Sequence, residues 1–164
     1  MPLEPPDKQF FQTACGYAEL GMYLDANAEL EKIDPFNRAA PEVLALRIGI
    51  YCGLEKWELM AELAKRLTEF EPNNPQWAVS LAYATRRAIS IEAAKEVLLK
   101  AESKFPEETV ILFNLACYEC QLGDLASAKD YLTRTIKIDA DWRITALGDP
   151  DLEPLWDSLK LKIE

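Results

Sequence analysis

The chain has 164 residues, 49% of them hydrophobic, and a formal net charge of −10 at pH 7. This apolar content excludes an intrinsically disordered chain, and the acidic charge disfavours nucleic acids and anionic membranes as partners, because both are bound through basic side chains. No run approaches the roughly 18 apolar residues of a transmembrane helix, and the absence of histidine removes the commonest general base and metal ligand.

The ends and motifs of the chain add two expectations. The stretch from Met1 to Asp7 is acidic and rich in proline, unlike a signal peptide, so a cytoplasmic location is expected unless a leader has been removed. Neither GxxxxGK[ST] nor GxGxxG occurs, so no nucleotide cofactor is expected. Together with the missing histidine, this disfavours an enzyme.

Apolar periodicity and helix breakers predict nine helices and no strand. The expected helices cover about residues 7–20, 24–33, 42–53, 56–70, 76–88, 91–104, 107–121, 125–138 and 151–162. Gly21 and Gly53 close the first and third helices, Gly123 lies in the turn before the eighth, and a loop holding Trp142 precedes the last. The short connections predict antiparallel pairs of helices.

A fixed period runs through these pairs. The positions of Pro72 and Pro106 differ by 106 − 72 = 34, and the same shift superimposes two further sets of residues: Ala14, Ile48, Ala82 and Ala116; and Phe10, Leu44, Ala78 and Leu112. Two helices in each period indicate a solenoid of stacked hairpins, in which each unit buries its apolar face against the next.

This pattern resembles the tetratricopeptide repeat, Trp-x2-Leu-Gly-x2-Tyr followed by Ala-x3-Phe and Pro. The fourth unit matches best, with Leu115 and Ala116 at the Leu-Gly positions, Gly123 in the turn and Ala128 at the small site. Arg38 replaces the proline of the first unit, so its second helix is short or its exit loop is long.

The resemblance implies an all-α, right-handed superhelix in a single domain, residues 7–164. Its four repeats cover about residues 7–40, 41–74, 75–108 and 109–142, and a capping helix covers about 151–162. The cap is expected because Leu152, Leu155, Trp156 and Leu159 have the spacing of one helix face.

In this family the first helices of the repeats line a concave groove that binds partners. The resemblance places the following residues there: Phe11, Gln12, Cys15, Glu19, Leu46, Gly49, Cys52, Gln76, Val79, Tyr83, Arg86, Arg87, Phe113, Asn114, Cys117, Cys120 and Gln121. One hypothesis is that the two arginines grip an acidic side chain or C-terminal carboxylate of an extended peptide, while Phe11, Tyr83 and Phe113 hold its apolar side chains. The alternative is that the arginines balance nearby glutamates on a solvated face.

The four cysteines, Cys15, Cys52, Cys117 and Cys120, all map to this groove. Thiols on helices about 8–10 Å apart cannot converge on one zinc ion, and Cys117 and Cys120 would stand too far apart in an intact helix for a disulfide. We therefore expect inert, small apolar side chains and no metal site.

These observations favour a non-enzymatic protein–protein interaction module that binds a peptide or partner protein in its groove, without a cofactor. One alternative is a structural scaffold that self-associates into a homo-oligomer. A variant of the first interpretation is a chaperone that holds a client protein. Fold alone does not choose between them.

Overall fold

The computed structural model describes residues 3–160, and every regular element in that range is helical. The first eight α-helices are α1 Asp7–Glu19, α2 Tyr23–Leu30, α3 Pro41–Gly53, α4 Trp57–Phe70, α5 Pro75–Ala88, α6 Ile91–Glu102, α7 Thr109–Gln121 and α8 Leu125–Ile138. A 3-10 helix, η1 Asn37–Ala39, lies between α2 and α3. The last elements are α9 Trp142–Gly148, the 3-10 helix η2 Pro150–Leu155 and α10 Trp156–Lys160. The all-α prediction is confirmed.

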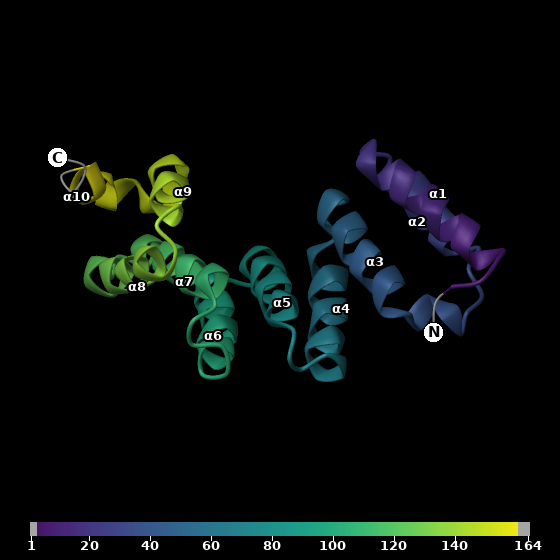
Figure 1. Ribbon diagram of the computed structural model, residues 1–164, viewed down its shortest axis with the longest axis horizontal. Helices are drawn as coiled ribbons and strands as arrows, with labels where there is room; N and C mark the ends of the chain where they lie inside the picture. Colours follow the sequence, from purple (N-terminus) through teal and green to yellow (C-terminus); the bar gives the residue numbers. More distant parts are fainter. Residues whose placement is uncertain (1–2, 161–164) are drawn as a thin grey trace.

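The helices follow one another along the long axis of the molecule, with α1 and α2 at one end and α10 at the other (Figure 1). Short turns join α1 to α2, α3 to α4, α5 to α6 and α7 to α8, so the chain forms four consecutive hairpins. No helix in the described range is long and apolar enough to cross a membrane.

The apolar core is divided into three clusters that follow the order of the hairpins. The first lies among α1, α2 and α3, the second among α3, α4 and α5, and the third extends from α5 to α10. Helix α3 contributes Ile50 to the first cluster and Ile48 to the second. Helix α5 likewise contributes Ala84 to the second and Ala82 to the third. Each hairpin therefore completes its core with the first helix of the next, as expected of a solenoid.

Small side chains fill most of the positions where helices approach closely. The small sites of the second helices, one period apart, are Ala26, Met60, Ala94 and Ala128, and all four are buried. Ala14, Ala82 and Ala116 of the first helices are buried as well. A methyl group at these positions allows the partner helix to pack at about 8–10 Å.

Three of the four turns within the hairpins use a left-handed residue at one site of the period, whereas Ile89 occupies this site in the third turn with a φ of −127°. Gly21, Glu55 and Gly123 have φ values of 72°, 54° and 88°. Glu55 follows Gly21 by one period of the repeat, and Gly123 follows Glu55 by two. The second turn therefore places a glutamate where the first and fourth turns have glycine, and its left-handed residue follows Gly53 by two positions.

Gly53, the last residue of α3, is a glycine because of a close packing contact rather than a left-handed backbone. A Cβ atom there would lie 2.2 Å from Cε2 of Tyr23, the first residue of α2. The tyrosine ring thus occupies the space that a side chain at residue 53 would need.

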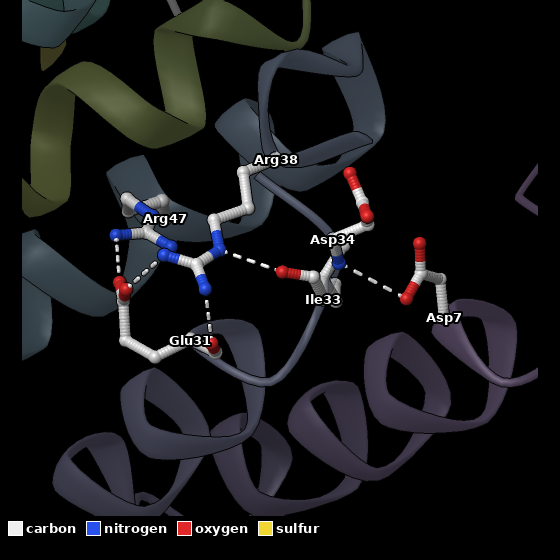
Figure 2. Close-up of polar contacts among 6 residues, drawn as sticks. All are labelled: Asp7, Glu31, Ile33, Asp34, Arg38 and Arg47. Atoms are coloured by element: carbon white, nitrogen blue, oxygen red, sulfur yellow. Dashed lines mark hydrogen bonds and ion pairs between the residues drawn. The ribbon is translucent and has the colours of Figure 1, made fainter. Parts of the chain in front are cut away.

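The second helix of the first hairpin is short and its exit loop is long, and the replacement of the repeat's proline by Arg38 predicts one or the other. Helix α2 ends at Leu30, and residues 31–40 lead to α3. Arg38 donates from Nε to the carbonyl of Ile33 at 2.7 Å, from Nη1 to the Glu31 carboxylate at 2.7 Å, and from Nη2 to the Glu31 carbonyl. Figure 2 shows that Arg47 of α3 reaches the same Glu31 carboxylate, at 2.6 Å. The arginine in place of proline therefore fixes the loop, and Arg47 connects the loop to the second hairpin through Glu31.

Buried Asp7 holds the same exit from the α1 side. Its Oδ1 accepts a hydrogen bond from the backbone N–H of Asp34 at 3.1 Å (Figure 2). Its Oδ2 accepts one from the Asn37 amide at 2.7 Å. Asp7, in the first turn of α1, thus fixes Asp34 in the loop and Asn37 at the start of η1.

The C-terminal part differs from the expectation in two ways. The expected loop at Trp142 is the helix α9, and the expected continuous helix 151–162 is divided into η2 and α10, with residues 161–162 outside the described range. Adding one period to α7, 109–121, gives 143–155, which is the range of α9 and η2. This segment is therefore a fifth first helix that is broken at Asp149–Pro150. Proline cannot donate the backbone hydrogen bond that would continue α9.

Candidate interaction surface

The predicted groove residues of the first two hairpins remain partly or fully accessible. On α1, Phe11 and Cys15 are half-buried and Gln12 and Glu19 are exposed. On α3, Leu46 and Cys52 are half-buried and Gly49 is exposed. Phe11 and Leu46 also pack against the first core cluster, so their apolar surface is shared between core and groove.

Helices α4 and α5 together carry a group of aromatic and cationic side chains, of which Tyr83 and Arg87 are exposed and Trp57 is half-buried. The guanidinium carbon of Arg87 lies 3.5 Å from the ring centroid of Tyr83 and 5.1 Å from that of Trp57. The two rings meet edge to face, with centroids 5.9 Å apart. We call Trp57, Tyr83 and Arg87 the aromatic-arginine cluster. Stacking on rings orients a guanidinium while leaving its hydrogen-bond donors free for a ligand.

Arg87 has no carboxylate partner within the described residues; its Nη1 donates to the carbonyl of Tyr83 at 3.2 Å. Arg143 aside, each remaining arginine of the described range is within ion-pair distance of a carboxylate: Arg38, Arg47, Arg66, Arg86 and Arg134. In a chain of net charge −10, an arginine that pairs with no carboxylate is an unusual feature.

The other groove residues of α5 are Gln76, which is exposed, and Val79 and Arg86, which are half-buried. Arg86 forms a two-pronged ion pair with Asp151 of η2, from Nη1 to Oδ2 at 2.5 Å and from Nη2 to Oδ1 at 3.3 Å. Hydrogen bonding to this carboxylate raises the pKa of Arg86 further above its usual value. Arg86 is therefore already paired with a carboxylate of the chain itself, and its predicted pairing with a partner's carboxylate remains a prediction.

On α7, the C-terminal segment covers most of the predicted groove residues. Phe113, Cys117 and Cys120 are buried, Asn114 is half-buried, and Gln121 is exposed. The Phe113 ring packs against Trp142 of α9 with centroids 4.6 Å apart, and Gln121 Nε2 donates to the Asp151 carbonyl at 3.0 Å. Trp142, which begins α9, thereby packs this helix against α7. In this arrangement, the predicted groove residues of α1 and α3 stay at least partly accessible, whereas most of those on α7 are covered.

Cys117 faces two carboxylates. Its thiol is 3.8 Å from Oδ2 of Asp149, and the ligand atoms of Cys117, Asp149 and Asp151 all lie within 4.8 Å of one another. Burial, followed by the Asp149 charge, raises the pKa of the Cys117 thiol well above its usual value. This shift reduces the thiolate fraction of Cys117 at neutral pH. Arg86 already supplies a positive charge to Asp151.

Part of this surface carried a sequence signal that the motif analysis missed. Tyr23 and Trp57 are one period apart, as are Gly53 and Arg87. The packing of Tyr23 against Gly53 therefore recurs one unit later as the packing of Trp57 against Arg87. The contacts of Arg86 and Cys117 with residues 149–151 had no such signal, because the break at Pro150 ends the periodic pattern.

No protein-family profile and no curated protein sequence matches the chain. Solved structures do. MamA 41-end from Desulfovibrio magneticus RS-1 superimposes with a TM-score of 0.72 at 16% identity, over 82% of this chain and 76% of that one. TTC0263, a thermophilic TPR protein of Thermus thermophilus, gives 0.66 at 18% identity, over 96% and 82%. The chain has a tetratricopeptide-repeat-like fold.

A third TPR-like match covers both chains almost completely: MamA MSR-1 gives a TM-score of 0.63 at 18% identity, over 98% of this chain and 100% of that one. At these identities, the matches bear on the fold alone. The binding surface has to be argued from the side chains of this chain.

Proposed function

We propose that the protein is a non-enzymatic interaction module whose concave face binds an extended acidic segment of a partner protein. The observation that carries the proposal is the aromatic-arginine cluster. It holds an exposed guanidinium in a fixed orientation at a position that the repeat pattern assigns to the concave face, with no carboxylate partner in the described range. A TPR-like stack supports this function because its first helices form a continuous concave surface.

The chemistry of the ligand follows from the neighbouring arginine. Arg86 and Asp151 show that a carboxylate can meet an arginine of this face with two hydrogen bonds. Arg87 offers the same donors next to two aromatic rings, which suit an apolar side chain beside the acidic one. The half-buried Phe11 and Leu46 provide further apolar contact along the open part of the groove.

The titration of the groove thiols fits binding rather than catalysis. Burial raises the pKa of Cys15, Cys117 and Cys120, which makes these thiols poorer nucleophiles at neutral pH. The sequence has no histidine to act as their base.

The test is fluorescence anisotropy with short labelled peptides in which aspartate alternates with leucine. Asparagine-for-aspartate and lysine-for-aspartate versions serve as ligand controls, and each is made with a free or an amidated C-terminus. We expect the acidic peptide to bind the wild type and Arg87→Glu to weaken it at least tenfold. Arg66→Glu, which changes the net charge equally at an exposed side chain of α4, is the matched control. Equal affinities of the wild type and the Arg87 variant would refute the proposal.

One observation favours self-association as a second function. Three exposed apolar residues recur at one site of the period, after or at the ends of the second helices: Phe36, 93% exposed, Phe70, 71%, and Ile138, 49%. Phe70 follows Phe36 by one period and Ile138 follows Phe70 by two. Light scattering tests this function: a dimer that Phe70→Glu dissociates supports it, and a monomer at all concentrations excludes it.

A further inference from the structure

We propose that residues 149–155 are an internal ligand of the concave face, and that an acidic partner segment reaches Arg86 only by displacing the Asp151 carboxylate. This inference rests on the proposed function, because it assigns the regulation of the same surface. It goes further in stating that one part of the groove is occupied until a competitor arrives.

The segment occupies the positions that a bound peptide would take. Three predicted groove residues contact it: Arg86 through the Asp151 carboxylate, Gln121 through the Asp151 carbonyl, and Cys117 through Asp149. Arg86 belongs to the third hairpin, so η2 reaches across α7 to the preceding first helix. A bound carboxylate, a bound backbone carbonyl and a polar contact at a thiol together resemble recognition of a peptide ligand, here one folded as the 3-10 helix η2.

The charges make this docking depend on one residue. Asp149 and Asp151 are close together, and Arg86 is the cation with which Asp151 pairs. The Arg86 and Asp151 side chains are 30% and 26% exposed, so a carboxylate from solvent can reach the pair. A competitor that takes the guanidinium leaves two neighbouring carboxylates without compensation, which favours release of the segment.

The segment is also built for limited rather than complete release. The helical backbone is broken at Pro150, before Asp151. Leu152 and Leu155, which follow Asp151 in the sequence, are buried in the third core cluster. We infer that the apolar anchors keep the segment near the groove while the acidic contact exchanges. A tethered segment competes at an effective concentration in the millimolar range, so a free peptide binds weakly to the closed form. The apparent dissociation constant of the free peptide is its intrinsic constant divided by the fraction of protein molecules in which the segment is released.

The experiment compares the wild type with Asp151→Asn and with Asp157→Asn. The second variant is a matched loss of one charge at an exposed residue of α10. The probe is a fluorescein-labelled peptide with the sequence of residues 147–156, and a second probe carries asparagine at the position of Asp151. We expect the first peptide to bind Asp151→Asn at least tenfold more tightly than the wild type or Asp157→Asn. The second peptide should bind none of the three well, because it lacks the carboxylate for Arg86.

Hydrogen exchange of the same full-length proteins reports on the segment directly. We expect faster exchange over residues 149–155 and 111–121 in Asp151→Asn, with α1–α4 unchanged as the internal reference for folding. Asp151→Arg should open the segment further, and Arg86→Asp combined with Asp151→Arg should restore protection by re-forming the pair with reversed charges.

Unchanged exchange over residues 149–155 in Asp151→Asn overturns the inference, since the segment is then a fixed cap. Faster exchange without tighter peptide binding also overturns it, because the released surface then accepts no acidic segment. Neither outcome touches the proposed function, which the Arg87 variant tests in the wild-type background.

Discussion

Replacement of Gly53 by alanine should destabilise the protein, although alanine is the better helix former. The new Cβ would lie 2.2 Å from Tyr23 Cε2, whereas ordinary contacts begin at 3.4 Å, so the ring must move away by the difference. Overpacking of this kind costs about 1–3 kcal/mol. The gain in helix propensity is at most about 1 kcal/mol and is smaller at the last residue of a helix. We therefore expect a net loss of about 1–2 kcal/mol.

Gly49 provides the control on the same helix, four residues earlier. A Cβ there meets nothing within 4 Å, so Gly49→Ala should stabilise the protein by about 0.5–1 kcal/mol. Urea denaturation followed by circular dichroism measures both, with the midpoint compared at equal slope. Stabilisation by Gly53→Ala as large as that by Gly49→Ala would refute the reasoning, and Tyr23→Ala should remove the penalty if the ring is its cause.

Three further predictions concern the turns, the buried tyrosine and the thiols. Glu55→Gly should stabilise the protein by about 1 kcal/mol, because a φ of 54° strains a residue that has a side chain. Gly123→Ala, at a φ of 88°, should destabilise the protein by a similar amount for the same reason. The urea midpoints of the two variants check these opposite signs. Burial raises the pKa of Tyr118 to about 12 from 10.0, so the unfolded state loses this proton first and stability falls as the pH rises from 10 to 12. Tyr118→Phe should flatten that fall in urea titrations at each pH, and an unchanged slope would contradict the assignment. In the native protein at pH 8, a thiol reagent should label half-buried Cys52 well before buried Cys117, with both labelled rapidly in urea; equal native rates would show that the segment over α7 is open.

The sequence was sufficient for the repeated part of the fold because its signals are local and recur. Gly21 and Gly123 mark the same turn in different units, Ala26 and Ala128 mark the same small site, and whole periods of the repeat align each pair. The departure at Arg38 was also visible in the sequence, where the missing proline predicts a short second helix or a long exit loop, and the structure has both. What the pattern did not supply was the partner of the arginine, because Glu31 lies seven residues away in a loop with no fixed period.

The end of the chain was less predictable for a physical reason. Leu152, Leu155 and Leu159 have helical spacing, yet they lie on a 3-10 helix and a short α-helix in succession. A hydrophobic pattern reports which side chains are buried but does not register that Pro150 interrupts the backbone bonds. The ion pair of Arg86 with Asp151 spans 65 residues, and only the folded arrangement brings the two together.

The sharing of α3 between two core clusters determines how disorder spreads through the molecule. Ile48 and Ile50 are two residues apart and support different cores, so fraying of this one helix removes support from the hairpins on both sides. Thermal loss of structure at the N-terminal end is therefore transmitted inward through α3 rather than contained in the first unit. The middle of the stack, where α3 and α5 each serve two neighbours, sets the cooperativity with which the whole array melts.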